Sequence, residues 1–116
     1  MNKYLILVIS IAISSQCLAG DETGTVRFQH GQYGHSSTSA GKTFFYLDGS
    51  TKKNTPACAT FSGGERWVIN NNWPGASMQL SILLAAKMSG KKVQIRGANN
   101  CGVHGDSETA SDLFIK

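Results

Sequence analysis

The sequence lacks the short motifs that mark the common hydrolases. It contains no Gly-x-Ser-x-Gly turn and no His-Glu-x-x-His motif, and no cysteine stands in a setting that would activate it. Its histidines and acidic residues have no spacing that is specific to a zinc or calcium site. The sequence therefore predicts a protein that is not an enzyme and has no cofactor or metal. A triad assembled from distant positions stays open as the alternative.

The sequence also has only a small excess of basic over acidic residues. The 116 residues include 11 basic and 7 acidic side chains, a formal net charge of +4. This excess is far below the basic footprint of a dedicated nucleic-acid binder, so no nucleic-acid partner is expected. Binding of single-stranded nucleic acid remains a less favoured alternative. Its basis is a group of basic residues around the end of a predicted helix: Lys87, Lys91, Lys92 and Arg96.

Long hydrophobic runs are absent except at the start of the chain. A charged start precedes a short apolar core at residues 4–13, and small residues follow up to Ala19. This pattern is typical of a secretory signal peptide, here residues 1–19. The apolar core is too short to span a bilayer, and Gln16 before Cys17 disfavours lipid attachment to that cysteine. We therefore expect an exported protein, secreted or periplasmic, without a membrane span.

Cysteine is rare, which makes the few cysteines informative. The sequence has three, and Cys17 would leave with the signal peptide. Cys58 and Cys101 would remain as an even pair in an oxidising compartment. The sequence predicts a disulfide between them, with two buried free thiols as the alternative. The exported part, residues 20–116, is expected to be a single small domain in which such a crosslink matters.

Alternating and helical patterns divide residues 20–116 into five strands and one helix. Strand segments alternate apolar and polar residues or are rich in aromatic and β-branched side chains, and polar or glycine-rich stretches separate them. The strands are expected at residues 23–29, 42–47, 65–70, 92–96 and 112–116, and the helix at residues 76–88. Val26 and Phe28 in the first strand, and Val93 and Ile95 in the fourth, are expected to face inward.

The helix boundaries have their own signals. Good helix formers dominate residues 76–88. An asparagine from residues 70–72 is expected to cap the start, and Gly90 is expected to end the helix in a left-handed conformation. Residues 30–41 and 98–111 are rich in polar residues and glycine and are expected to be loops.

A helix between the third and fourth of five short strands is the arrangement of an OB-fold. We therefore expect a mainly-β domain, a small five-stranded OB-fold-like barrel with one α-helix between strands 3 and 4. An open α+β sheet is the competing geometry, and closure is favoured because it protects strand edges.

Apolar residues of the helix extend over more than one face, which one small core cannot cover. The residues expected to form an interface with another copy are Met78, Ile82, Leu84 and Ala85. A homo-oligomer is therefore expected. The alternative is a small domain that simply exposes some apolar side chains.

The chain resembles a known family in layout and in a few short segments. The matching segments are residues 85–95, which contain Ser-Gly-Lys-Lys-Val-Gln-Ile, together with Ala57-Cys58 and Trp67 before the helix. They are similar to the subtilase-cytotoxin B subunits and the related pertussis-like toxin B subunits. The resemblance implies an OB-fold, a homopentamer, a catalytic A subunit as partner and binding of sialylated host glycans. The loop after the fourth strand departs from the family pattern, because it is glycine- and acid-rich.

Candidate glycan-binding residues follow from the resemblance and from the chemistry of sugars. Thr23-Gly24 is similar to a hydroxyl residue and glycine in the family's glycan site. Sugars need an aromatic platform and hydrogen-bonding side chains, and an anionic sugar also needs a cation or N–H groups. The candidates are Thr23, Arg27, Gln29, Tyr33 and Trp73. The plain alternative is that the strand residues are only solvated and that Trp73 packs over the helix start.

The sequence thus favours an exported glycan-binding module that resembles a toxin B subunit. The alternative is a monomeric periplasmic OB-fold protein with a structural or stress role and no sugar binding.

Overall fold

The computed structural model describes residues 19–32 and 41–116. Residues 1–18 of the expected signal peptide, including Cys17, and the candidate Tyr33 lie outside the described residues. The elements in chain order are β1 (Asp21–Gln32), β2 (Lys42–Asp48), the short 3-10 helix η1 (Phe61–Gly64), β3 (Trp67–Asn70), α1 (Ala76–Ser89), β4 (Lys92–Gly97) and β5 (Glu108–Ile115). The mainly-β class and the place of the helix between the third and fourth strands are confirmed.

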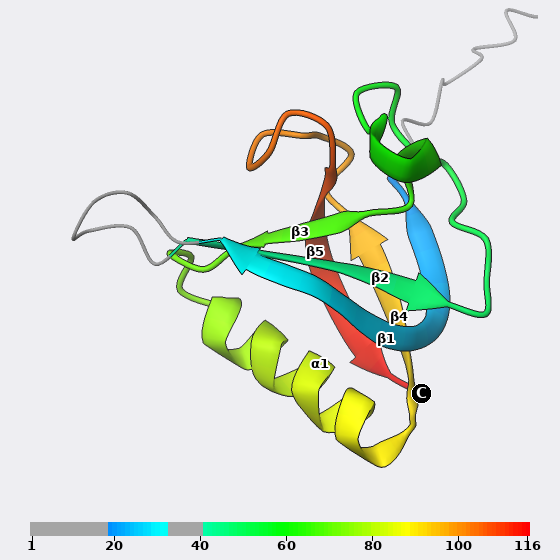
Figure 1. Cartoon of the computed structure of the whole chain (residues 1–116), viewed down its shortest axis with the longest axis vertical. Helices are drawn as coiled ribbons and strands as arrows, with labels where there is room; N and C mark the ends of the chain where they lie inside the picture. Colours follow the sequence, from blue (N-terminus) through cyan, green and yellow to red (C-terminus); the bar gives the residue numbers. More distant parts are fainter. Residues whose placement is uncertain (1–18, 33–40) are drawn as a thin grey trace, which may run out of the picture.

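The five strands form one sheet that closes on itself. Their order is β1-β2-β3-β5-β4, and β4 pairs back with β1. Neighbouring strands are antiparallel except β3 and β5, which run parallel. The long, bent β1 makes closure possible, because its first half pairs with β4 and its second half with β2 (Figure 1).

Two strands extend beyond their predicted ends. β1 continues through His30 to Gln32, where a loop was expected, because these residues pair with β2. β5 begins at Glu108, four positions before the predicted start, because its first residues pair in parallel with β3. In both places cross-strand hydrogen bonds impose an extended conformation on residues whose own preferences favour a loop.

The sequence predicts that Val26 and Phe28 of β1 both face inward. This prediction is confirmed for Val26 and wrong for Phe28. Val26 is buried, whereas Phe28 is exposed. The register with β2 is regular from Val26 to Phe28 and shifts only between Phe28 and His30, so Phe28 lies at the end of the regular pairing and outside the buried core. Glu22 takes the other inward position on β1 and is buried with Val26. In β4 both Val93 and Ile95 are fully buried, as expected.

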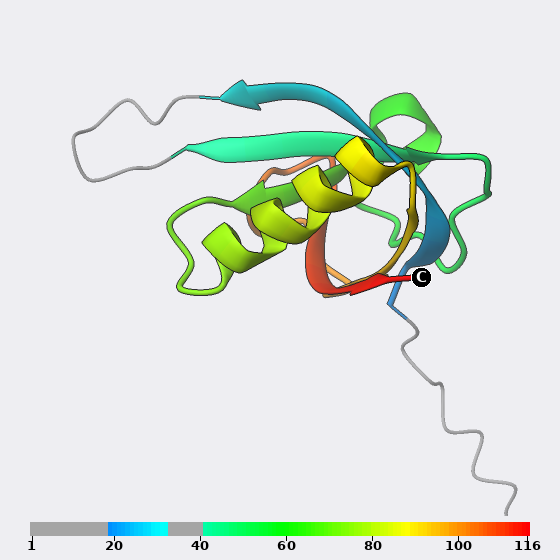
Figure 2. The same cartoon turned by 90° about the horizontal axis from the view of Figure 1, so that it is seen from below.

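Helix α1 lies at one end of the closed sheet, against β1, β4 and β5 (Figures 1 and 2). Ala76, Leu83 and Ala86 are buried and belong to the same core as Trp67 and Val26. Burial of this apolar stripe accounts for most of the helix's stability. Among the described residues no helix has the length and apolar character needed to cross a membrane.

The two ends of α1 were predicted with unequal success. Gly90 ends the helix in a left-handed conformation with φ 69°, as expected. The asparagine cap is wrong: the N-cap is Gly75, without a side-chain cap hydrogen bond. Asn70 instead accepts a hydrogen bond from the backbone N–H of Asn72, which stabilises the turn before the helix.

The predicted disulfide between Cys58 and Cys101 is present, with a Cα–Cα distance of 6.1 Å. It ties the segment before η1 to the loop after β4. The backbone N–H groups of Thr60 and Phe61 both donate to the carbonyl of Asp106, in the same loop. Figure 1 places η1 and this loop at the opposite end of the sheet from α1. The crosslink therefore secures the end of the sheet that the helix does not cover.

Candidate functional site

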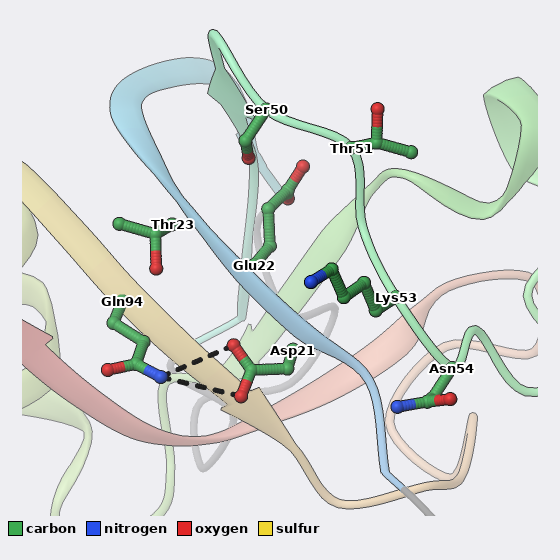
Figure 3. A pocket seen from close by; sticks show the side chains of 8 residues that line it. All are labelled: Asp21, Glu22, Thr23, Ser50, Thr51, Lys53, Asn54 and Gln94. Atoms are coloured by element: carbon green, nitrogen blue, oxygen red, sulfur yellow. Dashed lines mark hydrogen bonds between the residues drawn. The ribbon is translucent and has the colours of Figure 1, made fainter.

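A polar pocket of about 470 Å³ lies beside the first residues of β1 (Figure 3). Three parts of the chain form it: the start of β1, the segment that follows β2, and β4. The lining residues are Asp21, Glu22, Thr23, Ser50, Thr51, Lys53, Asn54 and Gln94.

Backbone pairing brings these three parts together. In the β1–β4 register Thr23 lies opposite Gln94. The segment after β2 folds back onto β1, where Asp21 and Lys53 exchange backbone hydrogen bonds of 3.0 and 2.9 Å. The pocket therefore lies between a regular strand pair and a short segment that is held to the strand edge.

The lining offers many hydrogen-bonding groups. Three hydroxyls, two side-chain amides, two carboxyls and one ammonium group surround the pocket. The Gln94 amide donates to both oxygens of the Asp21 carboxylate at 3.3 and 3.4 Å, which holds the two side chains in a fixed arrangement. Such a lining can bind a polyhydroxylated ligand through many directional hydrogen bonds.

A buried ion pair involves Lys52, which stands between the lining residues Thr51 and Lys53 in the sequence. The Lys52 ammonium lies 2.9 Å from Glu108 Oε1, and the two side chains are 1% and 0% exposed. Glu108 Oε2 also accepts hydrogen bonds from the backbone N–H groups of Gly20 and Asn99 at 3.0 and 3.1 Å. A single carboxylate therefore joins the residue before β1, the segment after β2 and the loop after β4.

Lys52 makes further contacts that fix the segment after β2. Its ammonium donates to the carbonyl of Gly64 at 3.0 Å and lies 3.8 Å from the centroid of the Trp67 ring. Burial lowers the pKa of Lys52, and the hydrogen bond and charge of Glu108 oppose that change. Lys52 thus depends on Glu108 to remain charged in the interior.

Glu22 is the unusual group of the pocket. Glu22 is only 2% exposed, and its Oε1 accepts a 2.9 Å hydrogen bond from Trp67 Nε1. Oε2 is buried and accepts no hydrogen bond of normal geometry from the described part of the chain. Burial raises the pKa of the Glu22 carboxyl, and the Trp67 hydrogen bond lowers it by less. The charge of Glu65 raises this pKa further, and the Ser50 hydroxyl has a small opposite effect.

Of the predicted glycan-binding residues that the structure describes, only Thr23 lines this pocket. Arg27 donates from Nε to both carboxylate oxygens of Asp48 at 3.0 Å and lies over the ring of Tyr46. Gln29 accepts a 3.2 Å hydrogen bond from Arg66. These two candidates lie farther along β1, beyond the pocket.

The aromatic candidate Trp73 does not line the pocket either. Trp73 is 43% exposed and lies just before α1. Tyr33 is outside the described residues. The pocket lining therefore contains no aromatic platform among the described side chains.

Sequence reasoning missed the other seven lining residues. Gln94 had a usable signal, because its outward position in an alternating strand was expected. The segment 50–54 reads only as a polar connection, and nothing local indicates that it folds back onto β1. Asp21 and Glu22 precede the predicted start of the first strand, so they were assigned to no face.

A second, apolar groove of about 330 Å³ runs between the start of α1 and β5. Its apolar lining comes from Pro74, Met78, Ile82, Leu113 and Phe114. The predicted interface residues Met78 and Ile82 therefore lie in one groove. Met78 is 70% exposed and Leu84 56% exposed, and Ala85 is also exposed. Much of the apolar surface of the helix is thus left outside the core, as its sequence indicated.

No group of three His, Cys, Asp or Glu residues is placed to hold a metal ion within residues 19–32 and 41–116. No family model, no curated protein and no solved structure matches this chain. The candidate site is accordingly defined by its own geometry, and Thr23 is where that geometry and the sequence-based candidates meet.

Proposed function

We propose that this protein is an exported glycan-binding module, built on an OB-fold and resembling a toxin B subunit. The observation that carries the proposal is the polar pocket around Thr23. An OB-fold is supported by the strand order β1-β2-β3-β5-β4 and by the helix between β3 and β4. Export is supported by the signal-peptide pattern of residues 1–19 and is consistent with the disulfide.

The pocket suits a sugar better than an apolar ligand. Hydroxyl, amide and carboxyl groups converge on it from three parts of the chain. A sugar ring presents several hydroxyls at fixed angles, so it can satisfy many such groups at once. Thr23 holds the position that the resemblance to toxin B subunits assigns to the glycan site.

Removing one pocket hydroxyl is expected to weaken glycan binding. The purified protein is first screened on a glycan array, and the best glycan is then titrated by calorimetry. Thr23→Val keeps the shape of the side chain and is expected to lower affinity about tenfold, the effect of one lost hydrogen bond. Thr25→Val is the matched control, because Thr25 is exposed on the same strand outside the pocket. An array without any bound glycan would contradict the proposal.

We further propose that the protein forms a homo-oligomer through α1, with the pentamer and the catalytic A subunit implied by the resemblance. Met78 and Ile82 in the apolar groove support this, since homo-oligomers bury matching apolar patches. Light scattering is expected to give a mass that is a multiple of the monomer, five in the simplest case. Met78→Lys is expected to reduce the mass to that of a monomer, whereas Ser77→Lys, exposed on the same helix, is not. A wild-type monomer at high micromolar concentration would contradict assembly and favour the monomeric periplasmic alternative.

A further inference from the structure

Two carboxyl groups that are adjacent in the sequence reach the same pocket from opposite faces of β1. Side chains alternate along a strand, so Asp21 and Glu22 point in opposite directions. The pocket contacts both because it lies at the edge of the strand, under the segment 50–54. In Figure 3 the Asp21 carboxylate turns toward Gln94 on β4, and the Glu22 carboxyl turns toward Ser50 and Thr51. A ligand in this pocket would therefore meet an acidic group on each side of β1.

Only one oxygen of Glu22 has a hydrogen bond of normal geometry from the described residues, and the Ser50 hydroxyl is the nearby donor of the protein on the other side of the carboxyl. The bonded oxygen is Oε1, which accepts from Trp67 Nε1. Buried polar atoms are nearly always hydrogen-bonded, and an exception in a pocket lining indicates a place for an external donor. A hydroxyl or ammonium group of a ligand would supply that donor, whereas a carboxylate would not.

The charges around the pocket also favour a ligand without a carboxylate. Lys53 is the one cation among the described lining residues, and it faces two carboxyl groups. The neighbouring Lys52 does not add to it, because its ammonium is buried against Glu108. Like charges that approach in a partly desolvated site repel each other, so an anionic sugar would be disfavoured beside the Asp21 carboxylate.

We propose that this pocket recognises a saccharide unit that donates hydrogen bonds and carries no carboxylate, and that Asp21 and Glu22 select it. This inference rests on the proposed glycan binding and gives that binding a substrate class. It differs from the sialylated ligands that the resemblance implies. Glu22 accepts a donor at the base of the pocket, and Asp21, held by Gln94, accepts one nearer the solvent.

The test compares paired glycans that differ in one acidic sugar. The purified protein is titrated with lactose-terminated and sialyllactose-terminated glycans, and an amino-sugar disaccharide serves as the ammonium-bearing probe. A wider array supplies further neutral and acidic pairs. Wild-type protein is expected to bind members without a carboxylate at least about tenfold more tightly than their acidic partners.

Two variants assign the selectivity to the carboxyl groups. Asp21→Asn and Glu22→Gln keep the side-chain shape, and each is expected to lose about tenfold in affinity for the preferred glycan and to reduce the discrimination against acidic ones. Asp48→Asn removes an exposed carboxylate outside the pocket and is expected to change neither value. Circular dichroism and thermal unfolding establish that each variant is folded.

The possible results separate the two claims. An absence of binding to every glycan would overturn the proposed function itself. Tighter binding of acidic members by the wild type would overturn the present inference and leave glycan binding intact. Unchanged affinity and selectivity in both pocket variants would also overturn it, because the carboxyl groups would then have no part in recognition.

Discussion

Removing the Cys58–Cys101 disulfide is expected to lower the free energy of unfolding by about 4 kcal/mol. The bond joins residues 43 positions apart, and the closed segment contains β3, α1 and β4. In the unfolded chain such a crosslink excludes many extended conformations, so its loss stabilises the unfolded state. A small domain has little reserve to absorb a loss of this size.

The measurement is urea unfolding of the wild type and of the double variant Cys58→Ser, Cys101→Ser. Reduction of the wild type supplies an internal control, since it is expected to reproduce the loss, while the double variant should not respond to reductant. A loss below about 1 kcal/mol would show that the disulfide adds little to the noncovalent structure. Cys58 precedes η1, which Figure 1 shows at the end of the sheet away from α1, so the helix is not expected to be the first element to melt.

Neutralising Glu108 is expected to cost about 3–5 kcal/mol, the range for breaking a buried ion pair by removing one partner. Glu108→Gln leaves the ammonium of Lys52 buried without its counter-charge. It also replaces an oxygen that accepts hydrogen bonds from Gly20 and Asn99 with a neutral amide. The start of β1 and the segment after β2 would both lose their attachment, so glycan binding is expected to fall together with stability.

A double-mutant cycle measures how much of this loss belongs to the ion pair. Lys52→Met removes the cation, and the double variant Lys52→Met, Glu108→Gln is expected to be more stable than Glu108→Gln alone, because no unpaired charge remains. Strictly additive losses in urea unfolding would contradict a coupled pair.

The pH dependence of Glu108→Gln follows from the lowered pKa of Lys52. Burial favours the neutral amine of Lys52. Between the lowered pKa of Lys52 in the folded protein and its ordinary pKa of 10.5, the unfolded chain therefore binds more protons than the folded one. Stability therefore rises with pH up to the ordinary lysine pKa of 10.5. Without Glu108 the Lys52 pKa is lowered further, so the deficit of the variant relative to wild type is expected to shrink between neutral pH and that value. A constant deficit would mean that Lys52 is hydrated in the variant.

The features that could be read from the sequence are those set by nearby residues. Helix formers and Gly90 determined α1 and its end, and alternation determined the inward faces of Val93 and Ile95. The disulfide followed from having two cysteines left after the expected signal peptide. Each of these inferences needs only composition, or interactions between residues a few positions apart.

The polar site could not be read in this way. Its residues come from positions 21–23, 50–54 and 94, and only the β1–β4 register and the fold of the segment after β2 bring them together. Glu108 was assigned to a loop, yet parallel pairing with β3 buries it where it can neutralise Lys52. Burial then separates the two acidic neighbours, leaving Glu22 desolvated and Asp21 at the pocket edge. The sequence by itself determined the elements and the crosslink, because those depend on local preferences. Only the tertiary structure decided the site, because desolvation and charge pairing depend on which distant residues become neighbours.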